Sequence, residues 1–339
     1  MTFKALSKSS APISEAGFIL PGVLAFVAAF TFILLTTAMT LERSRGLAVA
    51  LERQQSLAGA LDAAEAQATY LFLTARPVPD GLLLYPEAQS AVDIVLGTET
   101  ETPEVERKVW NADGGILLFA NAPYRTWAIY RDTAGLVSLT TGSADMIGRL
   151  LEDFDVSSNT AATLAARLKD YQDEDRVRRP LGAERADYRL RQRPSPSDSP
   201  LRSISELGRI YGWEELTFIN DLEFLAQVTS SFGSDRPIPR FATDRLRILM
   251  AEMPGRDMTQ LDILTQASNL RSVPSDRARL VLIAQDTESG ESIVRLIEIE
   301  RKPSAAAAPY TKALVAEFTD PNLPQNWLPR EDAQITVSP

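Results

Sequence analysis

The clearest feature of the sequence is an uninterrupted apolar run near its start. No charged residue occurs from Ala16 to Leu41, and most residues of this run are Phe, Ile, Leu, Val or Ala. About 20 apolar residues in a helix span the hydrocarbon core of a bilayer, and this run is long enough to span it even when tilted. The run therefore predicts one transmembrane helix. Its residues include Phe18, Gly22, Phe26, Phe30, Leu34 and Leu41.

Charges on either side of the run predict its orientation. Lys4 and Lys8 precede it, whereas Glu42, Arg43 and Arg45 follow it. A short basic N-terminus tends to stay in the cytoplasm, so we expect the bulk of the chain outside the membrane. A cleaved signal peptide has an apolar region of about 7–15 residues, which is much shorter than this run. Hydropathy alone leaves a plain signal anchor open as the alternative.

Apolar positions continue along one helical face after the membrane run. They recur at steps of three, four and six to seven residues, as in an amphipathic helix. These positions are Leu47, Leu51, Leu57, Leu61, Ala64, Ala68 and Leu71. Pro77 and Pro79 end the pattern. The sequence thus predicts a single helix over residues 18–75, and its part from Phe18 to Leu73 would be about 80 Å long at 1.5 Å per residue.

The remainder of the chain alternates between strand and helix patterns. Short strands are predicted at Leu117–Ala120 and Thr126–Tyr130, and a hairpin at Arg277–Gln285 and Ser292–Arg301 around Glu288-Ser289-Gly290. Arg193–Pro200, with three prolines, reads as a loop. Helices are predicted at Ala144–Phe154, Thr160–Tyr171, Ser203–Tyr211, Glu214–Ala226, Arg245–Met253 and Thr259–Ser268. Strands therefore flank a helical block of about a hundred residues, as in a sheet that is interrupted by an insertion.

Composition narrows the chemistry. The chain has 339 residues, 45% of them hydrophobic, and a formal net charge of −10. This charge gives no basic footprint for nucleic acid. The chain contains no cysteine and no histidine, which excludes disulfides, histidine-based zinc sites and Ser-His-Asp catalysis. Any metal would have to be a hard cation that is bound through oxygen.

One acidic cluster concentrates such oxygen ligands. Asp170, Asp173, Asp175 and Glu184 lie in one short stretch together with Glu174 and Asp187, and alternating acids of this kind can wrap Ca²⁺. Arginines crowd the same stretch, so a loop that is held by Arg–carboxylate pairs is the alternative. Paired carboxylates could also support acid–base chemistry, but these lie among arginines on a predicted loop. We expect no catalytic residue and no enzyme activity.

The start of the apolar run resembles a prepilin peptidase site. Type IV pilins and type II pseudopilins carry a polar leader that ends in Gly, followed by Phe and an apolar helix. The resemblance implies cleavage between Gly17 and Phe18 and methylation of the new N-terminus. Most pilins have Glu at mature position five, where this chain has Gly22. The K pseudopilin of the type II secretion system (GspK family) also lacks this Glu and is placed at the filament tip.

Motifs across the soluble part resemble the K pseudopilin family in order and spacing. Asp170–Asp175, Arg179–Glu184 and Asp187-Tyr188 are similar to its Asp-Trp-x-Asp-x-Asp, Arg-Pro-x-Gly-Ala-Glu and Tyr elements. Further similar segments are Ala128–Leu139, Pro200–Leu207 with Gly212-Trp213, and Met253-Pro254-Gly255.

The resemblance implies an α+β fold, with a long N-terminal transmembrane and amphipathic helix and a pilin-like antiparallel sheet that is interrupted by a large helical insertion. The expected parts are a leader at 1–17, the helix at 18–75, the first part of the sheet domain at 76–143, the inserted helical domain at 144–270, the closing strands at 271–303 and a flexible tail at 304–339.

The implied function is that of a minor pseudopilin in the inner membrane, with a periplasmic C-terminal domain, which nucleates or caps the pseudopilus and supports protein export. Its implied partners are minor pseudopilins I and J, the major pseudopilin, prepilin peptidase and the secreted exoproteins. Pseudopilins commonly bind calcium, so the resemblance also favours a calcium ion at Asp170, Asp173, Asp175 and Glu184. The alternatives are an unrelated single-pass protein with a periplasmic scaffold or sensing domain, and a membrane-anchored hydrolase.

Overall fold

The computed structural model of this chain describes residues 19–84, 108–121, 123–230, 233, 235–252, 273–302, 308–319 and 334–337. The chain divides into two compact units, Met1–Ser56 and Leu57–Pro339. The Gly17–Phe18 junction, the Met253-Pro254-Gly255 motif and the helix predicted at Thr259–Ser268 lie outside the described residues. The limits predicted for separate domains stay predictions.

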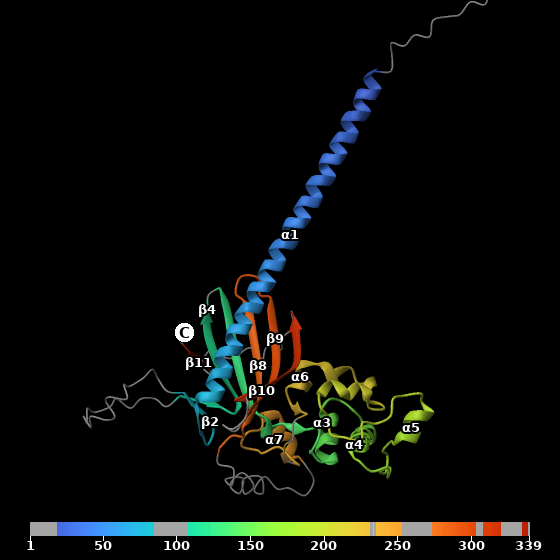
Figure 1. Cartoon of the computed structure of the whole chain (residues 1–339), viewed down its shortest axis with the longest axis vertical. Helices are drawn as coiled ribbons and strands as arrows, with labels where there is room; N and C mark the ends of the chain where they lie inside the picture. The colour runs from blue at the N-terminus through green and yellow to red at the C-terminus, as the bar shows by residue number, and fades with distance from the viewer. Residues whose placement is uncertain are drawn as a thin grey trace, which may run out of the picture. The chain divides into compact units, whose positions relative to one another are not determined.

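The long N-terminal helix is confirmed. Helix α1 runs over Ile19–Thr74, 56 residues, and Figure 1 draws it without a break. It ends shortly before Pro77, whose ring cannot continue a helix. Among the described helices, α1 is long and apolar enough to cross a membrane by length and composition. Its side chains are exposed up to Ser56, and from Leu57 onward one face becomes buried.

A six-stranded sheet forms the centre of the larger unit, in the order β10-β9-β8-β5-β4-β11. Its strands are β4 (Asp113–Asn121), β5 (Tyr124–Asp132), β8 (Arg277–Asp286), β9 (Ser292–Arg301), β10 (Tyr310–Thr319) and β11 (Gln334–Val337). All neighbours are antiparallel except β11 and β4, which are parallel. The predicted strands and the β8–β9 hairpin are confirmed, and Gly290 takes the left-handed φ of +76° in its turn.

Each face of the sheet packs against a different layer, because side chains alternate along a strand. On β5, Ala128 and Tyr130 belong to the core that contains the part of α1 from Leu57 onward, whereas Trp127 and Ile129 belong to the core of the helical segment. The buried residues of α1 in this core are Leu57, Leu61, Ala64, Ala68 and Phe72. Their spacing of three and four residues is that of the predicted amphipathic face.

The helical segment between β5 and β8 contains α3 (Ala144–Asp153), α4 (Ser158–Gln172), α5 (Arg185–Leu190), α6 (Leu222–Leu225) and α7 (Asp244–Ala251). Figure 1 places these helices beside the lower end of the sheet. Ser157 is the N-cap residue of α4, but its side chain makes no capping hydrogen bond to the backbone. Together with the strands, this segment gives the expected α+β class.

Two of the predicted helices in this segment are wrong. Ser203–Tyr211 forms only the 3₁₀ turns of η2 (Ile204–Arg209). Glu214–Ala226 breaks into η3 (Trp213–Glu215), η4 (Thr217–Asn220) and α6. Leu216 and Asp221 have extended backbones, which interrupt the ladder of helical hydrogen bonds. The apolar residues have the spacing of a helix here, but they lie in successive single turns and do not form a continuous helix.

The predicted flexible tail is also wrong over Tyr310–Thr319. This segment forms β10 and pairs with β9 over ten residues of strand, with a bulge between Leu314 and Ala316. The Ala- and Pro-rich stretch before Tyr310 concealed a strand that is rich in Thr, Val, Tyr and Phe. The short strand β11 pairs with β4 at the opposite edge.

Small sheets complete the larger unit. Strands β1 (Arg76–Val78), β2 (Gly81–Leu84) and β3 (Lys108–Asn111) form one, and β6 (Val137–Ser138) and β7 (Val228–Thr229) form a parallel pair. Strand β6 lies in the Ala128–Leu139 segment, whose resemblance implied a strand, a turn and a second strand. The other four were not predicted, because each has too few residues to show an alternating pattern.

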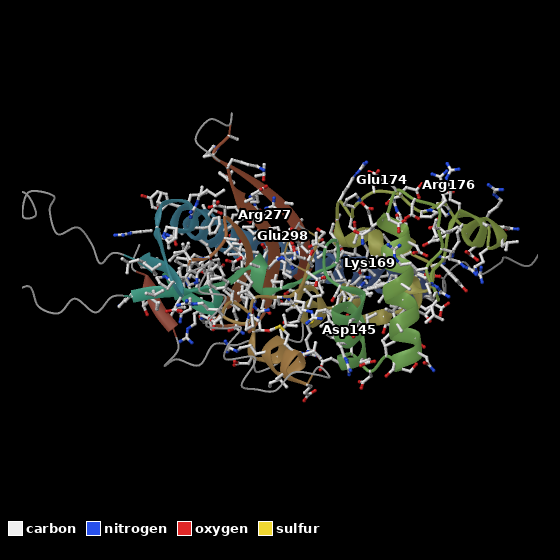
Figure 2. All side chains as sticks on the ribbon, turned by 90° about the horizontal axis from the view of Figure 1, so that it is seen from below. Asp145, Lys169, Glu174, Arg176, Arg277 and Glu298 are labelled. Atoms are coloured by element: carbon white, nitrogen blue, oxygen red, sulfur yellow. The ribbon has the colours of Figure 1, made fainter. Side chains whose placement is uncertain are left out.

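Arginines connect the helical segment to the sheet. Arg131 on β5 and Arg279 on β8 are direct cross-strand neighbours, and they donate hydrogen bonds to the carbonyls of Ala226 and Leu225, respectively, at the end of α6. Arg279 is fully buried and pairs with Glu298 on β9. Burial, together with the charge of Arg279, lowers the pKa of Arg131 to about 10. Figure 2 shows Glu298 and Arg277 at the boundary between the sheet and the helical segment.

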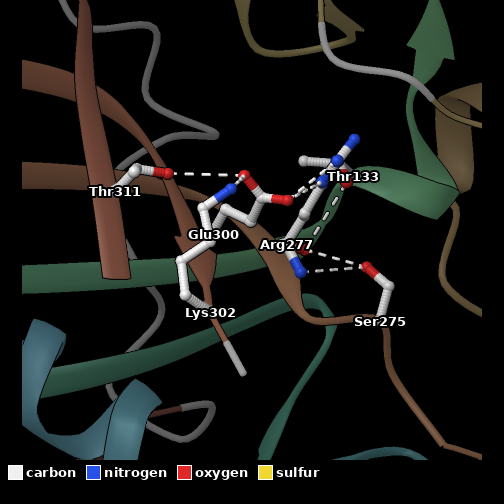
Figure 3. Close-up of polar contacts among 6 residues, drawn as sticks. All are labelled: Thr133, Ser275, Arg277, Glu300, Lys302 and Thr311. Carbon is white, nitrogen blue, oxygen red and sulfur yellow. Dashed lines mark hydrogen bonds and ion pairs between the residues drawn. The ribbon is translucent and has the colours of Figure 1, made fainter. Parts of the chain in front are cut away.

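A second charged row lies one pleat further along the same hairpin. Arg277 on β8 pairs with Glu300 on β9 at 2.8 Å, and Glu300 also accepts from Lys302 and Thr311. Figure 3 shows this network, with Ser275 and Thr133 on the other side of Arg277. Arg277 and Glu300 are about a third exposed, unlike Arg279.

Candidate functional site: an acidic cluster on the helical segment

The candidate site lies where α4 ends and α5 begins. Asp170 is in the last turn of α4 and is fully buried. Asp173 is the C-cap residue of α4, and Glu184 is the N-cap residue of α5. The intervening loop folds back between the two helices, so acids that are 11 residues apart in sequence come together.

Arg179 occupies the inner side of this loop. Its Nη1 donates to Asp170 Oδ1 at 2.8 Å and also contacts Asp173, and its backbone N–H donates to Asp170 Oδ2 at 3.2 Å. The hydrogen bonds with Asp173, and next those with Asp170, raise the pKa of the Arg179 guanidinium above its ordinary value. Asp170 is therefore satisfied by an arginine of its own loop.

Gly182 allows the loop to close against Asp170. A Cβ atom at this position would lie 1.9 Å from Asp170 Oδ2, too close for any side chain. Leu181, immediately before it, has a φ of +65°. The Arg-Pro-Leu-Gly turn is thus built around the buried Asp170 carboxylate.

Three acids beside this turn bring their carboxylates together, and only Asp173 among them is paired with Arg179. Carboxylate oxygens of Asp173, Asp175 and Glu184 lie within 4.8 Å of one another. Glu184 is 7% exposed, and its Oε1 is buried without a hydrogen-bond partner. Asp173 Oδ1 is likewise buried without a hydrogen-bond partner. Burial, and next the charges of Asp170 and Asp173, raise the pKa of the Glu184 carboxyl above its ordinary value. The site thus gathers three carboxylates, of which Asp173 is paired with Arg179, and leaves buried oxygens of Asp173 and Glu184 without a hydrogen bond.

This arrangement suits a hard cation. Unpaired, converging carboxylate oxygens are the ligands that Ca²⁺ takes in proteins. Asp173, Asp175 and Glu184, all in the predicted set, are the residues that could hold the ion. Asp170, the fourth predicted residue, is instead bonded to Arg179 and points to the inner side of the loop.

The sequence did not point to Asp198, which joins the cluster from the loop after α5. Its Oδ1 is buried without a hydrogen-bond partner, and its charge adds to those that raise the pKa of Glu184. Asp198 also pairs with Arg185 and has a left-handed φ of +48°. It lies within a Pro- and Ser-rich loop, and no residue spacing there indicated a ligand.

The predicted membrane residues lie on the first part of α1. Phe26, Phe30 and Leu34 are 72%, 53% and 55% exposed, and Leu41 is 53% exposed. A side chain at Gly22 would meet nothing within 4 Å. An apolar surface of this kind requires lipid or other helices around it. Phe18 and Gly17 lie outside the described part of the chain.

Comparison with known proteins gives one family match. Residues 132–223 match the family model of type II secretion system (T2SS) protein K. The match covers the helical segment from the end of β5 through α4, α5 and the acidic cluster. It confirms, over this segment, the resemblance to minor pseudopilin K that the sequence motifs indicated.

A solved structure is also similar to the chain. It is the crystal structure of the GspK-GspI-GspJ complex from the enterotoxigenic Escherichia coli type 2 secretion system. The matched chain has 18% sequence identity and a TM-score of 0.42, and the match covers 79% of this chain and 98% of that chain. No curated protein matches the chain significantly.

Proposed function

We propose that the chain is a K-type minor pseudopilin that nucleates or caps the tip of the type II secretion pseudopilus and so supports protein export across the outer membrane. The observation that carries this proposal is the match of the α3–α5 region to protein K in a chain whose first described element is the 56-residue helix α1. A family segment on an apolar helix of this length is the architecture of an assembly subunit.

The surface of α1 supports assembly. Apolar residues stay exposed beyond the membrane run, with Leu47 at 63% and Leu51 at 56%. Such residues are suited to pack against sister helices, by close apolar contact within the lipid and by burial outside it. The proposed neighbours are minor pseudopilins I and J and the major pseudopilin.

Two features favour a position at the tip. Gly22 supplies no carboxylate, so this subunit makes no demand for a buried charge partner in a subunit above it. The helical segment between β5 and β8 adds more than a hundred residues to one face of the sheet, and a subunit of that bulk is difficult to stack above. Exoproteins are further proposed partners.

The proposed topology places the N-terminus in the cytoplasm, α1 across the inner membrane and the larger unit in the periplasm. The proposed maturation is cleavage between Gly17 and Phe18 by prepilin peptidase, followed by methylation. This role is one of assembly and assigns no residue to catalysis.

The decisive experiment is the mass and N-terminal sequence of the mature protein from cells with active prepilin peptidase. We expect a chain that starts at Phe18, and Gly17→Ala should accumulate the unprocessed form. Leu47→Ser, a substitution in the same helix away from the junction, is the control and should be processed normally. A mature protein that still starts at Met1 would contradict the proposal and favour an unrelated single-pass scaffold or sensor.

A second test addresses the role of the span. Val23→Arg puts a charge near the start of the membrane run and should cost at least a few kcal/mol of insertion or assembly free energy. We expect loss of secretion and loss of the chain from the membrane fraction. Normal secretion by this variant would contradict the role of α1 in assembly.

We further propose that Asp173, Asp175 and Glu184 bind a calcium ion, with Asp198 as a neighbouring acid. The support is the pair of buried, unpartnered oxygens on Asp173 and Glu184. The ion would neutralise the charges that raise the pKa of Glu184 and would connect the ends of α4 and α5. The competing interpretation is that Arg179 alone holds the loop.

Calorimetry and thermal unfolding separate these interpretations. Calcium should raise the melting temperature of the wild type, and a chelator should reverse the rise. Glu184→Gln should weaken calcium binding at least tenfold, whereas Glu174→Gln, an exposed acid in the same loop, should not. A melting temperature that is unaffected by calcium and chelator would favour the loop held by Arg179.

A further inference from the structure

Three arginines of the helical segment surround the ring of Tyr211. Their guanidinium Cζ atoms lie 3.8 Å (Arg167), 4.2 Å (Arg191) and 5.9 Å (Arg193) from the centroid of that ring. Because these distances share one end point, no two of the Cζ atoms are further apart than about 10 Å, which is about the screening length of 0.1 M salt. Arg167 comes from α4, Arg191 is the C-cap residue of α5, and Arg193 follows in the next loop. Neighbouring elements (Figure 1) thus bring three positive charges to one place.

The backbone around Tyr211 is fixed by hydrogen bonds. The Tyr211 N–H donates to the hydroxyl of Tyr188 at 3.1 Å, and the Tyr211 carbonyl accepts from Arg167 Nη1 at 3.1 Å. The next residue, Gly212, has a φ of +92°, and a Cβ atom there would lie 2.6 Å from Arg167 Nη1. Gly212 therefore leaves room for the guanidinium of Arg167. The cluster is preformed, which lowers the entropy that a ligand would have to overcome.

Two of the three guanidiniums have no carboxylate partner in the described part of the chain. Arg193 alone forms an ion pair there, with Glu214. Arg167 donates to the carbonyl of Tyr211, and Arg191 Nη1 donates to the carbonyl of Asp187 at 3.1 Å. The Nε of Arg167 is also buried without a hydrogen-bond partner. The cluster thus holds two positive charges and one buried donor that the described residues do not match.

Two acids that adjoin the cluster are already bonded to other groups. Glu214 pairs with Arg193 through one oxygen, and its other oxygen accepts from the N–H of Gly212 at 2.7 Å. The carboxylate of Asp187 lies 3.5 Å from Arg178 Nη1 and accepts from the N–H of Glu184 at 3.0 Å. Neither carboxylate therefore serves as a counterion for the two unpaired guanidiniums.

The charge and the donors of this cluster suit a phosphate group. A guanidinium presents its N–H groups in a planar fork that matches phosphate oxygens, and it stacks on aromatic rings as these arginines do on Tyr211. Two guanidiniums without a counterion balance the two negative charges that a phosphate monoester approaches at neutral pH, whereas a carboxylate would balance one. Arg191 is exposed, so such a group can reach the cluster from solvent.

We propose that Arg167, Arg191 and Arg193, arranged around Tyr211, bind the phosphate group of a phosphate monoester. Arg167 and Arg191 supply the uncompensated charge, and the Tyr211 ring holds the guanidiniums together. A soluble phosphate monoester and a lipid with a monoester headgroup share this chemistry. The inference rests on these residues alone, and it depends neither on calcium at the acidic cluster nor on a role at the pseudopilus tip.

The test is calorimetric titration of the full chain in phosphatidylcholine nanodiscs with glycerol 3-phosphate, with empty nanodiscs as the reference. We expect saturable binding with a Kd below about 1 mM that weakens with salt. Arg167→Gln and Arg191→Gln should each weaken binding about tenfold or more. Arg191→Lys keeps the charge but lacks the planar fork, so it should recover only part of the affinity. Arg189→Gln, at an exposed position of α5, removes the same charge and should bind as the wild type does.

Further arms identify the source of the phosphate group. Dimethyl phosphate carries one charge and should bind about tenfold more weakly than glycerol 3-phosphate. Sedimentation of the nanodiscs with phosphatidic acid vesicles, but not with phosphatidylglycerol vesicles, would assign the site to a lipid headgroup if Arg191→Gln abolishes it. Binding of glycerol 3-phosphate without sedimentation would assign the site to a soluble monoester.

Three results would overturn the proposal. The first is a wild type that binds no glycerol 3-phosphate up to about 10 mM. The second is equal affinity in Arg191→Gln and Arg189→Gln, and the third is equal affinity of the wild type for dimethyl phosphate and glycerol 3-phosphate. The first two would leave the arginines with the structural role of packing on Tyr211, and the third would remove the match between two guanidiniums and a divalent anion.

Discussion

The two faces of the six-stranded sheet are covered by different kinds of contact. On the α1 face, Ala64 and Ala68 let the helix approach closely, and Phe72 packs edge-on against Tyr130 with ring centroids 6.0 Å apart. Two arginines of β9 reach α1 on this face: Arg295 pairs with Asp62 and Glu65, and Arg301 lies over the Phe72 ring, with its Cζ 5.0 Å from the ring centroid. On the other face, the fully buried Arg279 lies between the sheet and α6.

The difference concerns how specific each contact is. Apolar burial is non-directional, so the α1 face depends on volume and fit. The buried guanidinium of Arg279 stabilises the fold only when Glu298 and the Leu225 carbonyl lie at the correct positions. We therefore expect the helical segment to be fixed to the sheet in a single arrangement, and its attachment to be the less tolerant of substitution.

The largest expected effect comes from Arg279→Met. Removing this guanidinium takes the cation away from Glu298, which keeps the hydrogen bond from Thr229, and takes the donor away from the Leu225 carbonyl in a buried site. The free energy of unfolding should fall by about 3–5 kcal/mol. Urea titration of the full chain, followed by the fluorescence of Trp110, Trp127 and Trp213, measures it. All three tryptophans are buried in the larger unit.

Arg277→Met is the matched control for this substitution. Arg277 pairs with Glu300 one pleat further along the same strands, but its side chain is 31% exposed. A partly exposed pair contributes at most about 1 kcal/mol. Equal losses for the two variants would contradict the importance of burial in this contrast.

A smaller loss is expected on the α1 face. Leu61 is fully buried against the sheet, so Leu61→Ala should lower the free energy of unfolding by about 2–4 kcal/mol through lost burial and a cavity. Leu47→Ala, at a 63% exposed position in the other compact unit, should leave that value unchanged in the same titration. A neutral Leu61→Ala would show that α1 is dispensable for the stability of the sheet.

The smallest expected effect is a pH dependence at the rim of the α1 face. Burial raises the pKa of Glu65, but hydrogen bonds from Lys312 and Arg295 outweigh it and leave the pKa below its ordinary value of 4.5. Ionised Glu65 therefore stabilises the fold above pH 4.5, and this stabilisation is lost as the pH falls through the lowered pKa. In Glu65→Gln, the free energy of unfolding should fall less than in the wild type as the pH decreases below 4.5. An equal fall in both proteins would contradict the stabilising role of ionised Glu65.

Periodic patterns predicted the parts of the fold that rest on apolar burial. The α1 helix and the β8–β9 hairpin each repeat one pattern over many residues, so local spacing was sufficient. Strand β10 was missed because it is an edge strand without a buried residue. The break-up of Glu214–Ala226 depends on tertiary packing that spacing does not record.

The candidate site was predicted in part for the same reason. Asp173, Asp175 and Glu184 are close in sequence and were found together. Asp170 and Asp198 differ from expectation because the first is taken by Arg179 and the second arrives from a loop beyond α5. Likewise, the contact of Arg279 with Leu225 joins residues 54 apart in sequence, and no local pattern indicates it.

The outermost strands of the sheet come from the end of the chain, β10 at one edge and β11 at the other. Because β10 and β11 follow β4, β5, β8 and β9 in sequence, the sheet cannot be completed before these two strands have been synthesised. Until then β9 and β4 carry open edges, which are sites for chaperone binding or mispairing.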